Sequence, residues 1–548
     1  MGKRFNLAVL LTAMLAAQDS TTPTFRTGTR LVEVDVVVRD DKGPVKGLTK
    51  EDFTLLDKGK PQAIAIFSVR SADSKAPKPA PLPNGVVSNR LRSRGDEPVS
   101  ATVVLIDRLN TAVEDQSRIR LQALKYLRAA GGDEGIALYA LNKKLTVLQE
   151  FTEDRERLIR AAEKAPIETS VDLTAGDVAV ADNGILLSAD LTQMSQNAVA
   201  NTLDNARQRR VDGTTAALET LARHLSGMPG RKKLIWISGS FPMVFTQEET
   251  HNLSTTTEHQ DFSDPIDRRI QSLNAANVAV YPIDPRGPLV GLSDPNIDAE
   301  VYLASRTGGK ANYGSNDIAG ALEAAITDTD LTYTLGFYTN INEADGTYHS
   351  LTVKVDRPGV QIRNRLGYND EKPLVVDDKK LRRTLNAWVQ EPLESTEIGI
   401  RASAFGVPDK PGSYRVEVFV DPSELQLEQK NGRWVGLFDL AIVPDGENKP
   451  KGLLQRVKVN LTEKRLREAA VSGISVSNVV QVVDQKGKLL SDKLHIVVQD
   501  AATPKSGSVR VPITWTWAAN ARAPQQNTDP QPVPISERSP LGGRRGGR

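Results

Sequence analysis

The residues from Ala101 to Thr111 read Ala-Thr-Val-Val-Leu-Ile-Asp-Arg-Leu-Asn-Thr and place polar side chains directly after an apolar run. The run ends at Asp107, and a short polar loop leads to Thr111 before a helical pattern begins. Open α/β sheets bind ligands at the carboxyl ends of their strands. We therefore expect the Asp107 carboxylate and the Thr111 hydroxyl to lie at the binding edge of such a sheet.

Residues for catalysis are scarce in the chain. It has no cysteine, which excludes disulfides, thiol catalysis and cysteinyl metal sites. There is no Gly-x-Ser-x-Gly elbow and no glycine-rich phosphate loop after the first apolar strand. Of the five histidines, His251 and His259 lie in a polar loop without the spacing of a helical metal pair. We predict a protein that is not an enzyme, with an envelope hydrolase using Asp107 and these loop histidines as the alternative.

The charge balance gives no general attraction to nucleic acid. Lys plus Arg number 70 and Asp plus Glu number 68, a net charge of +2. The basic cluster Arg207–Arg210 is interpreted as a solvated helix end, and Arg231–Lys233 precedes a buried strand. No specific nucleic-acid partner is expected.

The amino terminus is typical of an export signal. Lys3 and Arg4 precede an apolar stretch from Phe5 to Ala17, which is shorter than the ~20 residues that a membrane span needs. We predict a signal peptide at 1–18 and a periplasmic or extracellular protein, with an uncleaved anchor helix as the alternative. No other apolar run approaches membrane length, so no span is expected in the mature chain.

A chain of 548 residues is too long for one core. Alternating valines predict a small β module at 28–70, and the prolines and charges of 71–98 predict an extended, exposed linker. A helical connector is predicted at 371–395 and a β-sandwich-like domain at 396–520. The Pro-, Gln-, Gly- and Arg-rich tail, 521–548, is predicted to be disordered.

Between these parts, residues 99–370 alternate strand-like and helix-like patterns and end in a β extension. This order predicts an α/β domain with a doubly wound, mostly parallel sheet covered on both faces. An antiparallel hairpin at Leu145–Leu148 is expected to form one edge. Strands are predicted at 102–106, 135–141, 145–149, 233–238, 278–283 and 332–338. Helices are predicted at 114–130, 154–164, 185–209, 213–227, 264–276, 298–307 and 316–328.

The central domain resembles a von Willebrand factor type A domain. The resemblance rests on Val103 to Thr111, on Gly213-Thr214 opening a helix, and on the buried strand Leu234–Ser238. It implies a magnesium ion held by an Asp-x-Ser-x-Ser loop, a Thr from a second loop and an Asp from a third. A carboxylate of the protein partner would complete the coordination.

The match to that pattern is incomplete. Asp107, Thr111 and Thr214 fit ligand positions, with Thr215 as an alternative to Thr214. Leu109 stands where a hydroxyl is needed, and Ser238-Gly239-Ser240 replaces the third-loop carboxylate. Since Mg²⁺ usually relies on one or two carboxylates plus waters, a site with Asp107 alone would be weak. The alternative is a metal-free face, with Asp107 bonded to loop amides and Thr111, Asp115 or Thr214 capping helices.

A narrower resemblance, over about residues 28 to 370, is to the secreted "VWFA-related acidobacterial" family of bacteria. The matching segments are Leu31–Val38, Gly47–Phe53, Asp107–Thr111, Leu225–Lys232, Ile235–Pro242, Thr307–Gly309, Tyr333–Tyr338 and Arg363–Tyr368. We predict an exported interaction protein, adhesive or scaffold-like, that binds a protein partner at the strand ends. An inert structural scaffold is a further alternative. The predicted partner-binding residues are Asp107, Asn110, Thr111, Thr214, Ser238 and Ser240.

Overall fold

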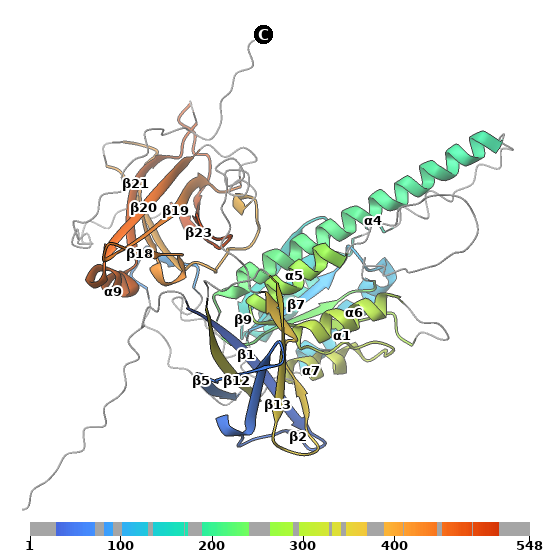
Figure 1. Cartoon of the computed structure of the whole chain (residues 1–548). Coiled ribbons are helices and arrows are strands. Elements are labelled where there is room, and N and C mark those ends of the chain that lie inside the picture. The colour runs from blue at the N-terminus through green and yellow to red at the C-terminus, as the bar shows by residue number, and fades with distance from the viewer. Residues whose placement is uncertain are drawn as a thin grey trace, which may run out of the picture.

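The computed structural model describes most of the chain in several packed units (Figure 1). The described residues are 29–71, 82–90, 101–129, 135–168, 170–173, 189–228, 230–240, 263–288, 295–327, 331–340, 347–369, 388–408, 410–446, 452–484 and 486–513. The predicted signal peptide, the tail, His251 and His259 lie outside them, as does most of the predicted connector. No helix among the described residues is long and apolar enough to cross a membrane.

A five-stranded sheet forms the centre of the predicted α/β domain. Its order is β11-β10-β7-β8-β9, and every pairing is parallel except that of β8 with β9. The antiparallel hairpin predicted at the edge is therefore confirmed. Every residue of the four parallel strands is buried, as expected for a sheet covered on both faces. The strands are β7 (Ala101–Asp107), β8 (Gly135–Leu141), β9 (Leu145–Thr152), β10 (Lys232–Ile237) and β11 (Val278–Ile283).

Helices cover both faces of this sheet. One apolar core joins it to α4 (Ala189–Ser226), α5 (Ser263–Ala275) and α6 (Pro295–Thr307). The other joins it to α1 (Val113–Ala129), α2 (Arg155–Lys164) and α7 (Ile318–Thr327). Alternate residues of each strand enter opposite cores, for example Val103 in the first and Val104 in the second. The unit is thus doubly wound.

Helix α4 is one 38-residue helix rather than the two predicted at 185–209 and 213–227. Gly213 and Thr214 therefore lie inside a helix instead of opening one. A Cβ atom at Gly213 would lie 3.0 Å from Leu109 Cδ2, so the glycine makes room for a buried leucine. At 1.5 Å per residue the helix is about 57 Å long. Its amino-terminal part projects beyond the sheet (Figure 1).

The strand predicted at 332–338 does not belong to the central sheet, which corrects that prediction. It is β12 (Leu331–Asn340), and it pairs antiparallel with β1 (Thr29–Asp40) and β5 (Ile66–Ser71). Strands β12 and β1 both carry apolar residues at every second position. Tyr333, Leu335 and Phe337 therefore share one core with the β1 valines.

This amino-terminal β unit therefore combines segments from both sides of the α/β domain. Its two sheets have the orders β14-β1-β12-β5 and β15-β13-β3-β4, and β2 also pairs with β1. The remaining elements are β2 (Gly43–Pro44), η1 (Lys50–Asp52), β3 (Phe53–Asp57), β4 (Lys60–Gln62), β13 (Tyr348–Val355), β14 (Gln361–Arg363) and β15 (Gly367–Asn369).

The basic cluster Arg231–Lys233 joins this β unit to the central sheet. All three side chains are buried. Arg231 donates to the carbonyls of Asp35 and Gly308, and Lys232 Nζ donates to the Met228 carbonyl at 2.8 Å. Burial lowers the pKa of Lys232 to about 7. These cations thus have structural partners within the chain.

Residues 398–513, together with β6 (Val87–Ser88), form two further sheets that enclose one apolar core. One has the order β21-β17-β16-β6, and the other has the order β18-β19-β22-β23 with β20 paired to β19. The elements are β16 (Ile400–Gly406), β17 (Ser413–Val420), η4 (Pro422–Glu424), β18 (Glu428–Lys430), β19 (Arg433–Pro444), β20 (Leu453–Thr462), α9 (Glu463–Ser472), β21 (Ile474–Gln481), β22 (Lys493–Asp500) and β23 (Ser506–Pro512).

Part of the predicted exposed linker is buried in this carboxyl-terminal unit, a second correction. Strand β6 (Val87–Ser88) pairs with β16, and Ser88 and Asn89 are fully or almost fully buried. Asn89 Nδ2 donates to the carbonyls of Ser395 and Ile398, each at 2.8 Å, while its Oδ1 accepts from Ile400 N at 2.7 Å. The side-chain amide replaces the backbone pairing that a longer strand would give, so a sequence rich in Pro and charge still holds a buried strand.

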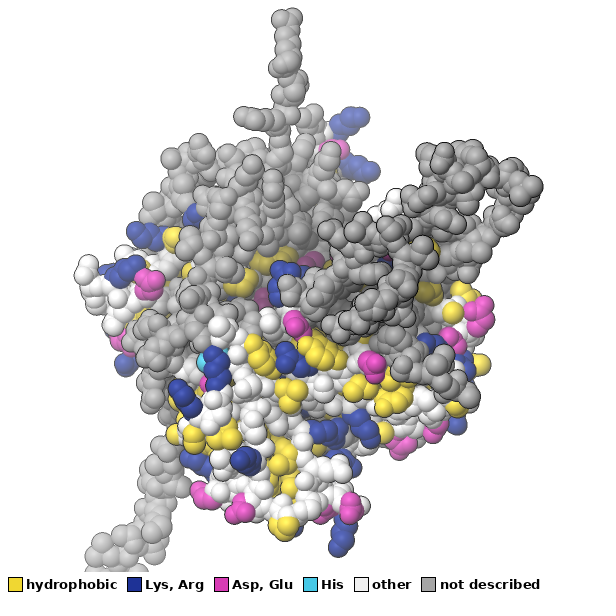
Figure 2. All heavy atoms as spheres, turned by 45° about the vertical axis from the view of Figure 1, so that its right-hand side comes forward, with side chains coloured by type: hydrophobic (Ala, Val, Ile, Leu, Met, Phe, Trp, Pro, Cys, Tyr) yellow, Lys and Arg dark blue, Asp and Glu magenta, His cyan; other side chains and the backbone are white. Residues whose placement is uncertain are grey.

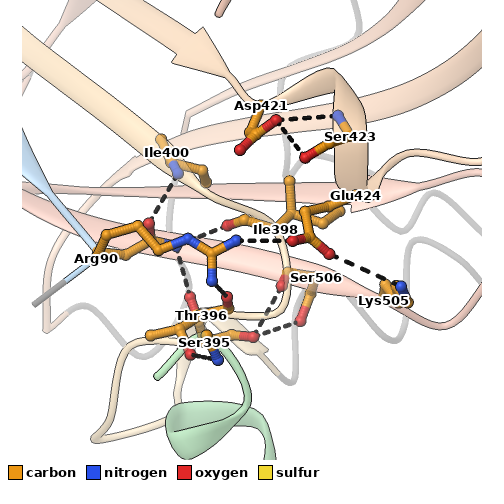
Figure 3. A network of polar contacts seen from close by, with 12 residues as sticks. Arg90, Ser395, Thr396, Ile398, Ile400, Asp421, Ser423, Glu424, Lys505 and Ser506 are labelled. Carbon is orange, nitrogen blue, oxygen red and sulfur yellow. Dashed lines mark hydrogen bonds and ion pairs between the residues drawn. The ribbon is translucent and has the colours of Figure 1, made fainter. Parts of the chain in front are cut away.

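Arg90 continues this attachment (Figure 3). Its guanidinium donates to the Thr396 carbonyl at 2.8 Å and to Glu424 at 3.1 Å. Thr396 Oγ1 in turn contacts α4 through the carbonyls of Arg223 and His224, at 3.1 and 2.7 Å. Thr396, whose carbonyl accepts from Arg90, therefore links the carboxyl-terminal unit to the end of α4.

A second contact at this junction is ionic. Arg223 of α4 pairs with Glu219 at 2.7 Å and also binds Glu391. Burial raises the pKa of Glu391 to about 7, although Arg223 opposes the shift. The junction therefore carries a carboxylate whose charge changes near neutral pH.

Candidate functional site

Asp107 ends β7 with no exposed surface, and four donors surround its carboxylate. Oδ1 accepts from Asn110 N at 3.0 Å. Oδ2 accepts from Asn110 Nδ2 at 2.8 Å and from Trp236 Nε1 and Ser238 Oγ, each at 3.0 Å. Burial raises the pKa of Asp107, and these hydrogen bonds oppose the rise. Both carboxylate oxygens are thus used within the protein.

Asn110 connects Asp107 to helix α4. Its Nδ2 also donates to Thr214 Oγ1 at 3.0 Å, and its Oδ1 accepts from Arg210 Nε at 2.8 Å. A carboxylate only accepts and a guanidinium only donates, so the chemistry of its neighbours fixes the orientation of the amide. The amide therefore lies between the carboxylate, the hydroxyl and the guanidinium.

The loop after β10 joins the same network. Gly239 N donates to Thr111 Oγ1 at 2.9 Å, and Ser240 Oγ donates to the Asn110 carbonyl at 3.0 Å. Arg210 Nη2 donates to Ser240 Oγ at 2.8 Å. We call the residues of this network the strand-end face: Asp107, Asn110, Thr111, Arg210, Thr214, Ser238 and Ser240.

The structure brings all six predicted partner-binding residues into this face. Asp107, Asn110, Thr111, Thr214 and Ser238 are at most 3% exposed, whereas Ser240 is half-buried. Thr111 and Thr214 accept from the protein rather than capping helices as the metal-free alternative supposed. The five buried residues can support a binding surface but offer little area to a partner.

Arg210 is the residue of the face that the sequence interpretation missed. The sequence predicts a solvated helix end at Arg207–Arg210, but α4 continues to Ser226 and the Arg210 side chain is half-buried. Burial lowers the pKa of Arg210, and the charge of Asp107 raises it. Arg210 and Thr214 are four residues apart, and this spacing predicts that they lie on the same face of one helix.

These residues do not fit a magnesium ion in this arrangement. Mg²⁺ needs oxygen ligands in near-octahedral geometry, but the Asn110 NH₂ group lies between the oxygens of Asp107 and Thr214. Thr111 Oγ1 is bonded to Gly239, and Leu109 is buried against Gly213. The positive charge of Arg210 interacts with the carboxylate of Asp107. Within the described ranges, no group of three or more His, Asp or Glu side chains could hold a metal ion.

A second strand end carries its own cation. Asp284 follows β11, is buried, and forms an ion pair with Arg286 at 2.7 Å. Asp284 is not among the six predicted partner-binding residues, although it also follows a strand of the central sheet. Arg286 donates to both carboxylate oxygens of Asp284, so this carboxylate has a counter-ion without a metal.

The described histidines are bonded elsewhere. His349 contacts Asp57 at 2.9 Å in the amino-terminal β unit, and His495 Nδ1 contacts the Val389 carbonyl at 3.1 Å. His224 Nδ1 contacts the Glu394 carbonyl at 2.8 Å, at the junction below α4. These three partners lie outside the strand-end face. In Figure 2, charges of both signs are interspersed on the visible surface.

The strand order, the single antiparallel edge and the two helical layers define a doubly wound α/β unit with additional β units. No family model and no curated protein matches the chain.

Three solved structures are similar to less than half of this chain. An aerotolerance-related membrane protein from Bacteroides fragilis is 11% identical with a TM-score of 0.22, over 42% of this chain and 98% of that chain. BatB from Bacteroides thetaiotaomicron is 10% identical with a TM-score of 0.21, over 42% and 97%. A mussel byssus matrix protein with a zinc-occupied MIDAS motif is 7% identical with a TM-score of 0.23, over 45% and 49%. Scores this low assign neither family nor function, so the class rests on the topology.

Proposed function

We propose that the protein is an exported, non-enzymatic interaction protein whose type A-like domain binds a protein partner at the strand-end face without a divalent cation. The single observation that carries the proposal is the closed hydrogen-bond network around Asp107 and Asn110. It fixes the loops after β7 and β10 against α4, at the edge where open α/β sheets bind ligands. We further propose that the chain belongs to the acidobacterial group that it resembles.

The composition of the face supports binding over catalysis. Ser238 donates to Asp107, whose oxygens are already occupied, so neither is prepared for nucleophilic or acid–base chemistry. Arg210 and Ser240 are the half-buried members of the face and therefore its contact residues. The deeply buried members hold these two in place.

Site-specific photo-crosslinking tests the proposal. A benzoylphenylalanine at Arg207, exposed on α4 and one turn before Arg210, is placed in the full chain in the cells that make it. The control position is Val471 on α9, which is 84% exposed. We expect one protein to be cross-linked from position 207 and not from 471, equally in 5 mM Mg²⁺ and in EDTA, each at roughly physiological ionic strength. Equal labelling from both positions, or none from 207, would contradict the proposal.

A further inference from the structure

We propose that Arg210 is the recognition group of the strand-end face and that it binds a carboxylate from an acidic segment of the partner. This inference rests on the proposed function and names the chemical class of the partner.

The guanidinium of Arg210 is held in a fixed orientation. Nε donates to Asn110 Oδ1 and Nη2 donates to Ser240 Oγ, both at 2.8 Å. Two acceptors along one edge of a planar fork fix both its position and the direction of its plane. The edge formed by Nη1 and the second hydrogen of Nη2 has no partner among the described residues. A preorganised pair of donors therefore faces away from Asn110 and Ser240.

Arg210 also differs in charge pairing from three other arginines of the α/β unit. Arg209 pairs with Asp172 at 2.6 Å, Arg118 with Asp115 at 2.7 Å and Arg286 with Asp284. Arg210 forms no ion pair in the described parts of the chain, and the charge of Asp107 reaches it through the neutral Asn110 amide.

A half-buried cation without a direct counter-ion has lost hydration, and the charges of Asp107 and Asp172 act on Arg210 without an ion pair to either carboxylate in the described parts of the chain. Burial accordingly lowers the pKa of Arg210. An incoming anion would recover this cost, so the site favours a negative ligand over a neutral one.

The donor geometry favours a carboxylate. Two parallel N–H groups match the two oxygens of one carboxylate in a bidentate pair. A phosphate group would leave further oxygens without donors among the described residues of the face. An Asp or Glu side chain on a protein segment is therefore the ligand to which we commit.

Direct binding to the full chain tests the proposal with defined probes. A fluorescent twelve-residue peptide of alternating Glu and Gly is compared, at ~50 mM salt to limit screening, with the matching Gln–Gly peptide. Sodium acetate and inorganic phosphate serve as competitors. We expect the Glu peptide to bind at least about tenfold more tightly than the Gln peptide, a difference of ~1.4 kcal/mol.

Arg210→Gln should abolish that preference, and Arg210→Lys should weaken it because the charge remains but the fork is lost. Arg209→Gln is the matched control, because Arg209 is the adjacent, exposed residue of the same helix, and its binding should stay within about twofold of wild type (~0.4 kcal/mol). Thermal melting of each variant verifies that it is folded.

Three results would overturn the proposal: equal affinity for both peptides, an unchanged Glu preference in folded Arg210→Gln and Arg210→Lys, or displacement by phosphate at far lower concentration than by acetate. The last result would identify a site for free phosphate. If cross-linking from position 207 succeeds while these results occur, the proposed function stands and only the acidic partner class fails. If the Glu peptide is preferred while cross-linking from position 207 fails, the carboxylate preference of Arg210 stands and the proposed binding of a protein partner at this face fails.

Discussion

The Asp107 carboxylate and the Asn110 amide have different roles in the strand-end face. The carboxylate collects donors from its own loop, from β10 and from the loop after β10. The amide then transmits this arrangement to Thr214 and Arg210 on α4. Removing the carboxylate leaves several buried donors without an acceptor, and removing the amide leaves Arg210 Nε without an acceptor and Thr214 Oγ1 without its donor. Either loss is more costly than that of one exposed hydrogen bond.

Asp107→Asn tests this dependence. An asparagine offers one acceptor oxygen and would direct its NH₂ group at existing donors, so we expect a loss of roughly 2–4 kcal/mol in the free energy of unfolding. Urea denaturation followed by tryptophan fluorescence measures the loss.

Asp115→Asn is the matched control for that change. Asp115 forms a partly exposed ion pair with Arg118, and its removal should cost less than about 1 kcal/mol. Equal losses in the two variants would show that the Asp107 network does not stabilise the fold.

The site residues were predictable from the sequence to the extent that they follow strands. Asp107 ends β7, Asn110 and Thr111 follow it, and Ser238 and Ser240 follow β10, so topology alone places them at one edge. Arg210 could not be found in this way, because its partner Asn110 is remote in sequence and its helix was expected to end nearby. The metal pattern also could not show that an amide would take the position between Asp107 and Thr214.

At the scale of single elements, strand β6 shows how a short segment can be fixed by one side chain. Asn89 makes three hydrogen bonds with the backbone around β16, all in a buried setting. This segment is rich in Pro and charged residues. Its composition does not show which backbone groups of a strand remote in sequence form hydrogen bonds with it.

Asn89→Ala should destabilise the carboxyl-terminal unit by about 3 kcal/mol or more, because two carbonyls and one amide lose their partner. Limited proteolysis and denaturation of the full chain measure the change. Ser423→Ala, on an exposed hydrogen bond with Asp421 in the same unit, is the control and should change stability by less than about 1 kcal/mol. A loss no larger than that of the control would contradict the role of Asn89.

Glu391 makes the α4 junction sensitive to pH. Its pKa is raised from 4.5 to about 7 in the fold. Between those values the folded chain holds a proton that the unfolded chain has released, so the free energy of unfolding rises as pH falls from 7 to 4.5. Arg223, Glu219 and Glu397 are the charged groups that act on it.

Glu391→Gln should remove this contribution, which amounts to at most about 3 kcal/mol. The measurement is the difference in unfolding free energy between wild type and variant at pH 8 and at pH 4.5, with wild type gaining at the lower pH. Glu428→Gln, at an exposed ion pair, is the control and should give parallel curves. Parallel curves for Glu391→Gln as well would show that its burial has no energetic effect.

At the scale of the whole molecule, the units are assembled from segments that are distant in sequence. The amino-terminal β unit needs β12 to β15, and the carboxyl-terminal unit needs β6. The alternation of apolar residues predicted the strands and most helices correctly. It misplaced β12 because periodicity identifies a strand without naming its partner.

The carboxyl-terminal unit should therefore depend on a segment that precedes the α/β domain. We expect residues 388–513 expressed alone to melt at least about 5 °C lower than the same fragment fused to residues 82–90. Thermal unfolding followed by circular dichroism measures this difference. The fused fragment carrying Asn89→Ala is the control and should melt like the unfused one. Equal melting of all three would contradict the dependence.

The pairing of β1 with β12 limits how early the amino-terminal β unit can fold during synthesis of the chain. Thr29 pairs with Asn340, so roughly 300 residues must be synthesised before the first strand meets its neighbour. Until then the row of valines that later enters the core has no sheet to join. Contacts this distant close slowly, and a waiting strand is open to wrong pairings. The α/β unit can complete its own sheet earlier, so it would act as the template on which the two ends of the β unit are brought together.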